Sequence, residues 1–116
     1  MRYFGDFGSA QDVLNQWNGA NLTDAVVIAA VYHQESYEGD AMIVYRKEGK
    51  LYEVHDSHCS CNGLDNWNPE ETTYEALSDR LSKTHSHDIA RYGEDFAEAI
   101  RKGLVDEAFE REILVK

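Results

Sequence analysis

The feature that most constrains the fold is an unbroken apolar run, Val26-Val27-Ile28-Ala29-Ala30-Val31-Tyr32. Valine and isoleucine are β-branched, and such residues favour extended strands over helices. No polar residue alternates with the apolar ones, which is typical of a strand that is buried on both of its faces. The run therefore predicts the central strand of a sheet.

Two further segments with strand character follow this run. Ala41–Arg46 comes after the polar turn Glu38-Gly39-Asp40, and the turn Glu48-Gly49-Lys50 joins it to Leu51–His55. Two strand-like segments that flank a short turn containing glycine are typical of a β-hairpin. Together with the central strand they predict a small three-stranded antiparallel meander.

Helical patterns lie on either side of the predicted sheet. Ser9 is a candidate N-cap, with Asp12 as its capping-box partner, for a short helix that ends near Gly19. Apolar spacing and the Asn68-Pro69 start predict a helix over 69–82, and similar spacing predicts another over 88–102 and a shorter helical pattern after it. The sequence thus predicts an α+β fold, in which about three to four helices cover one face of the meander.

Length and composition place the chain in one domain, residues 1–116. A chain of 116 residues with 42% hydrophobic content can build one core, and no linker or repeat divides it. The longest apolar stretch, Ala25–Tyr32, is too short to cross a bilayer, and no signal peptide is recognisable. We therefore expect a cytoplasmic protein without a membrane anchor.

The chain is strongly acidic: Asp and Glu number 22 against 11 Lys and Arg, a formal net charge of -11. Such a charge repels phosphate backbones, so we expect no direct binding to nucleic acid. Two interpretations of the acidity remain open, namely solvation and docking on a basic surface of another protein, where helical carboxylates imitate nucleic acid. The candidate partner-binding residues are Glu70, Glu71, Glu94, Asp95, Glu98, Asp106 and Glu107.

One segment, from His55 to Cys61, is dense in residues that can bind metals or react. Cys59 and Cys61 are too close in sequence to form a loop-closing disulfide, so they are free thiols or metal ligands. With His85 and His87 they give four ligands of the type that close a tetrahedral zinc site, and His55 and His58 are alternates. The pattern resembles the SWIM-type zinc module, which implies one structural zinc.

Two other interpretations of the same segment stay open. Cys59 can be a nucleophile, with His55 or His85 as its base and Asp56 orienting the base. No glycine-rich oxyanion turn accompanies these residues, so we assign no catalytic site and favour a protein that is not an enzyme. In the simplest interpretation the two thiols only pack beneath a loop.

Several segments resemble a group of small proteins encoded by tailed bacteriophages and prophages. They are Gly49-Lys50-Leu51-Tyr52-Glu53-Val54, Ser57-His58-Cys59-Ser60-Cys61, and Trp67-Asn68-Pro69-Glu70-Glu71-Thr72-Thr73. The resemblance implies a location in the cytoplasm of an infected or lysogenic bacterium. It also implies a role in binding and modulating a host complex that handles nucleic acid or defends against phage. Self-association of the chain remains an open possibility.

Overall fold

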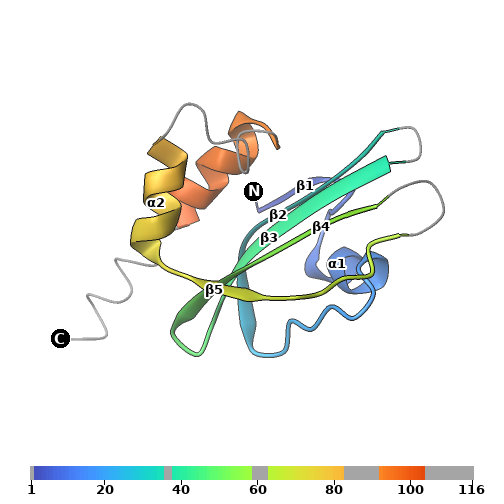
Figure 1. The fold of residues 1–116 in the computed structure, drawn as a ribbon, viewed down its shortest axis with the longest axis horizontal. Helices are drawn as coiled ribbons and strands as arrows, with labels where there is room; N and C mark the ends of the chain where they lie inside the picture. Colours follow the sequence, from blue (N-terminus) through green and yellow to red (C-terminus); the bar gives the residue numbers. More distant parts are fainter. Residues whose placement is uncertain (1, 36–37, 59–62, 83–91, 104–116) are drawn as a thin grey trace.

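The computed structural model describes residues 2–35, 38–58, 63–82 and 92–103. In chain order the elements are β1 (Tyr3–Gly5), α1 (Ala10–Gln16), β2 (Ala25–Glu35), β3 (Glu38–Lys47), β4 (Lys50–His58), β5 (Glu70–Thr72) and α2 (Tyr74–Ser82), followed by a helix over 94–103. The strands form one sheet in the order β1-β2-β3-β4-β5 (Figure 1). β1 runs parallel to β2, and the other neighbours are antiparallel.

The prediction of a three-stranded antiparallel sheet is wrong, because the sheet has five strands and is mixed. The three predicted strands form its centre, and each is longer than expected. The two missed strands, β1 and β5, have three residues each and are defined by their pairing with β2 and β4. A three-residue strand is too short to show a period of its own in the sequence.

The helix predicted from Pro69 begins later than expected. Glu70–Thr72 pairs with β4 as β5, and α2 starts at Tyr74. The hydroxyl of Thr73 accepts a hydrogen bond of 3.0 Å from the backbone N–H of Ala76, so Thr73 caps the helix. At α1 the predicted N-cap is confirmed, because the Ser9 side chain accepts from the N–H of Asp12. The Asp12 carboxylate accepts from the N–H of Gly8 and not from that of Ser9, and the helix ends at Gln16, earlier than predicted. Of the helix predicted over 88–102, residues 88–91 lie outside the described residues.

β2 contributes side chains to two cores, and a bulge shifts its alternation between them. Val27 pairs with Tyr45 and Ala29 pairs with Val44, so Ile28 is an extra residue in the ladder. Val31, Met42 and Val44 belong to one buried cluster, on what we call the helical face of the sheet. Ala30, Ile43 and Val54 belong to the other, on the opposite face. Both faces of β2 are therefore covered, as the unbroken run Val26–Tyr32 predicted, but the middle strand of the sheet is β3 and not β2.

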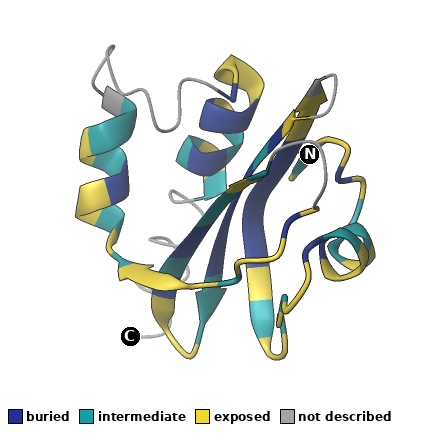
Figure 2. Ribbon diagram, turned by 45° about the vertical axis from the view of Figure 1, so that its right-hand side comes forward, coloured by how far each residue is buried: buried dark blue, intermediate teal, exposed yellow. Residues whose placement is uncertain are grey.

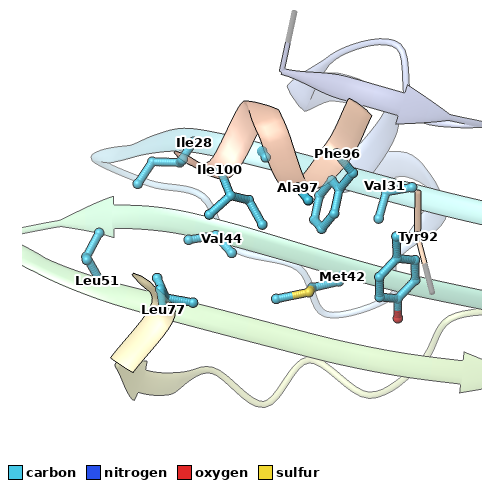
Figure 3. Packing of buried hydrophobic residues seen from close by; sticks show 11 residues of the cluster. Ile28, Val31, Met42, Val44, Leu51, Leu77, Tyr92, Phe96, Ala97 and Ile100 are labelled. Carbon is cyan, nitrogen blue, oxygen red and sulfur yellow. The ribbon is translucent and has the colours of Figure 1, made fainter. Parts of the chain in front are cut away.

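Helices cover both faces of the sheet, so the prediction of helices on one face is wrong. α2 and the helix over 94–103 pack on the helical face, where Leu77, Phe96 and Ile100 contact the sheet (Figure 3). On the opposite face α1 contributes Val13, and the residues after it contribute Trp17. Figure 2 shows the buried central strands lying between these two layers.

A tight turn fixes the register between β3 and β4. Lys47 pairs with Lys50, and the two intervening residues, Glu48 and Gly49, have φ angles of 54° and 77°. Two-residue hairpin turns with positive φ match the twist of the strands, but a left-handed backbone is unfavourable for a residue with an ordinary side chain. Glu48 therefore carries backbone strain that Gly49 avoids.

Replacing Glu48 with asparagine should raise the free energy of unfolding by about 1 kcal/mol, because asparagine tolerates the left-handed region. Urea denaturation of the purified protein measures this change. Glu48→Ala is the matched control, since it removes the same charge and keeps an ordinary side chain at the strained position. Equal stabilisation by both variants would show that charge, and not backbone conformation, limits this turn.

Candidate acidic interface

The outer surface of the helical layer carries exposed carboxylates because its apolar residues face the sheet. In the helix over 94–103, Phe96, Ala97 and Ile100 are buried. The spacing of these residues leaves Glu94, Asp95 and Glu98 on the exposed side. In α2 the buried residue is Leu77, and the exposed acids are Glu75 and Asp79. We call these five acids, Glu75, Asp79, Glu94, Asp95 and Glu98, the acidic helical surface.

The positive charge of Arg80 is directed away from this surface and toward the sheet. Arg80 Nη1 lies 2.6 Å from Oε2 of Glu53, and Nε2 of His55 lies 3.0 Å from Oε1 of the same carboxylate. Glu53 is only 7% exposed, so its carboxylate depends on these two partners. Burial alone would raise the pKa of Glu53, but the hydrogen bonds and charges of His55 and Arg80 outweigh it and lower the pKa.

A second arginine, Arg101, stays at the outer surface. Its Nη1 lies 2.7 Å from Oε1 of Glu94 and 3.2 Å from Oε2 of Glu98. These two carboxylates raise the pKa of Arg101 through hydrogen bonds and charge, so the guanidinium remains fully protonated. Glu75 and Asp95, in contrast, have no ion-pair partner within the described part of the chain.

The two adjacent acids of β5 point to opposite faces of the sheet. Glu70 pairs with Glu53 and therefore lies on the helical face, close to α2. Glu71 pairs with Tyr52 and lies on the opposite face. Both side chains are exposed. Of the remaining predicted contacts, Asp106 and Glu107 lie outside the described residues.

The predicted zinc ligands Cys59, Cys61, His85 and His87 all lie outside the described residues. The alternates His55 and His58 are described, and the alternation of β4 places them on opposite faces. His55 contacts Glu53 on the helical face, whereas Nε2 of His58 lies 2.6 Å from the hydroxyl of Tyr32 on the opposite face. Within the described ranges no group of three His, Cys, Asp or Glu side chains can hold a metal ion.

The structure does not place Asp56 where it can orient His55. As neighbours in a strand, their side chains point in opposite directions. One oxygen of Asp56 accepts hydrogen bonds from the N–H groups of Asp65 and Asn66, at 3.0 Å and 3.1 Å. Asp56 thus fastens Asp65 and Asn66 to the end of β4. Asp56 therefore does not orient His55 as a catalytic base, while Cys59 and the other candidate base, His85, lie outside the described residues.

No motif in the sequence indicates two hollows at the surface of the described residues. One, of about 470 Å³, lies where the β2–β3 hairpin meets the end of β4, and it is lined by Glu38, Gly39, Asp40, Ser57, His58, Gly63 and Asp65. The other, of about 480 Å³, lies between α1 and the start of β2, and no charged residue lines it. Leu14, which is 41% exposed, lines the second hollow. Each hollow joins segments far apart in the chain, so no local motif marks it.

Comparisons of the chain with known protein families, with curated proteins and with solved structures gave no match. Among the helices in the described ranges, none has the length and apolar character needed to span a bilayer. The acidic helical surface is therefore interpreted from its own geometry and charge.

The Glu53 carboxylate should make the stability of the domain dependent on pH. Because its folded-state pKa is lowered, its contribution is fully present above the ordinary glutamate pKa of 4.5 and is lost as the pH falls through the lower folded value. Glu53→Gln should cost about 1–3 kcal/mol at pH 7, because Arg80 loses its charged partner. The variant should also flatten the fall in stability below pH 4.5. Urea denaturation at about ten pH values between pH 3 and pH 7 measures both effects.

Glu71→Gln is the control, because Glu71 lies on the neighbouring strand with an exposed side chain. It should change stability by less than about 0.5 kcal/mol. Equal losses in the two variants would mean that the pairing with Arg80 and His55 adds nothing beyond net charge.

Proposed function

We propose that this chain is a phage-encoded accessory protein, without catalytic activity, that acts in the cytoplasm of the host bacterium. It binds a host protein through the acidic helical surface and so modulates or inhibits the complex to which that protein belongs. The resemblance to phage proteins supports the cellular setting. The charge of the exposed carboxylates supports the mode of binding.

One observation carries the proposal: the outer face of the helical layer has few positive charges to balance its acids. The described residues of α2 and the helix over 94–103 include three basic residues. Arg80 is directed to Glu53, so among the described residues of these two helices Arg101 and Lys102 remain beside Glu75, Glu94, Asp95 and Glu98. Glu70 adds a further carboxylate beside α2.

The chemistry of this surface favours a partner with a basic groove or patch. Complementary charge raises the association rate and suppresses binding to acidic proteins. Proteins that handle nucleic acid carry such basic surfaces, because they neutralise phosphates with lysine and arginine. The partner that fits best is therefore a nucleic-acid-handling or anti-phage defence assembly of the host. Its binding should weaken as salt rises, because exposed charges are screened beyond about 8–10 Å at physiological ionic strength.

Neutralising three acids of the acidic helical surface should weaken partner binding by roughly 3- to 150-fold, given about 0.2–1 kcal/mol for each exposed charge pair. The test variant combines Glu75→Gln, Asp95→Asn and Glu98→Gln. Bacterial lysate is passed over the immobilised protein at low and high salt, and the captured partner is then purified. Its association with wild type and variant is measured by surface plasmon resonance.

A matched variant combines Asp24→Asn, Glu38→Gln and Asp65→Asn, which removes the same charge from exposed sites away from the helical layer. It should keep nearly full affinity. Capture that does not respond to salt, or equal losses in the two triple variants, would contradict docking through the acidic helical surface. Capture of no partner at either salt concentration would contradict the function itself.

A further inference from the structure

Within the described residues, the helices leave the helical face of the sheet uncovered at the start of β2. Val26 lies on this face, because its neighbours Ala25 and Val27 pack in the opposite core and side chains alternate along a strand. Val26 is 43% exposed, whereas Ile28, the next residue on the same face, is only 5% exposed. We call the part of the face around Val26 its open end.

The helix over 94–103 runs toward this open end. Just before the helix, the hydroxyl of Tyr92 donates a hydrogen bond to the backbone carbonyl of Ala41, which lies opposite the second half of β2. At the other end of the helix, a β-carbon on Gly103 would collide with the side chain of Ile28, so the backbone of Gly103 lies directly against it. The chain therefore leaves this helix beside the open end.

We propose that residues 104–116 dock on the open end and complete the cover of the helical face. These residues lie outside the described ranges, and they continue the chain from Gly103. Val26 is two residues beyond Ile28, about 7 Å at the usual rise of a strand, a distance that about two to five residues of extended or helical chain can span. The segment also supplies the apolar side chains that such a contact requires, namely Leu104, Val105, Phe109, Ile113, Leu114 and Val115.

The charge of the segment complements the charge around the open end. Residues 24–26 and 46–50 surround the open end, and Arg2 lies beside it, with Nη1 2.7 Å from the carbonyl oxygen of Val27. Together these residues carry four basic side chains and two acidic ones. Residues 104–116 carry four acidic side chains and two basic ones. The open end therefore attracts the segment, whereas the acidic helical surface repels it.

Attachment to the same chain favours this occupant over a separate molecule. A segment that is tethered beside its site has a local concentration that is roughly millimolar. The contact is independent of the proposed function, but it bears on the predicted interface. Asp106 and Glu107 then lie at the open end, and they do not extend the acidic helical surface.

Photo-crosslinking tests the contact in the full chain. The photoreactive residue p-benzoylphenylalanine replaces Val26, the dilute protein is irradiated, and the linked peptides are identified by mass spectrometry after digestion with trypsin. Links from position 26 to residues 104–116 of the same chain are expected. The same replacement at Leu14 is the control, because Leu14 is 41% exposed but belongs to α1, which packs on the opposite face. It should give no such links.

Limited proteolysis measures the strength of the contact. A protease specific for glutamate cuts residues 104–116 after Glu107, Glu110 and Glu112. Val26→Asp removes the apolar contact and repels these acids, so the rate of cleavage should rise by roughly 5- to 30-fold. Leu14→Asp adds the same charge away from the open end and should change the rate by less than about twofold. Circular dichroism confirms that each variant is folded.

Equal cleavage rates in the two aspartate variants would overturn the contact with Val26. Links from position 26 that form only between two chains, or that never reach residues 104–116, would also overturn it. The crosslinking variant keeps an apolar side chain at position 26, so its result decides the proposal if Val26→Asp fails to fold.

Discussion

The structure depends on one constraint: the middle of the sheet, residues 27–32 of β2 and 41–45 of β3, is apolar on both faces. A sheet of this kind must be covered on both sides, and the helices that cover it in the described part of the chain are short. α1 and the segment around Trp17 and Leu64 cover one side, while α2 and the helix over 94–103 cover the other. The bulge places both Ile28 and Ala29 on the helical face, so the alternation of β2 between the two layers shifts by one residue there.

The need to cover both faces of the sheet explains which parts of the fold the sequence predicts and which it does not. The run Val26–Tyr32 and the glycine turn at Gly49 identified the centre of the sheet, because buried strands and tight turns leave strong local signals. β5 left no local signal in the sequence. Glu70–Thr72 is extended because it pairs with the free edge of β4, although Pro69 and two acids suggested the first turn of a helix. The coverage of the opposite face likewise depends on distant contacts, such as the hydrogen bond from Trp17 Nε1 to the carbonyl of Asn66.

The same distinction applies to the candidate sites. In the sequence His55 and Asp56 look like partners, yet adjacent residues of a strand face opposite sides, so each finds a partner elsewhere. Arg80 looks like an ordinary exposed helix residue, and only the fold brings it to Glu53, 27 positions away. Sequence reasoning therefore identified which residues carry charge, but could not say which charges are satisfied within the chain.

That distinction bears directly on how the acidity of this protein is interpreted. The net charge of -11 measures an excess, but a partner responds to the charges that remain accessible. Arg80 and Arg101 both bind carboxylates, and they do so with opposite consequences. The pair of Arg80 with Glu53 is shielded and joins α2 to the sheet, so it belongs to the framework of the fold. The pairs of Arg101 lie in water, where an ion pair exchanges partners readily, so they remain part of the accessible surface.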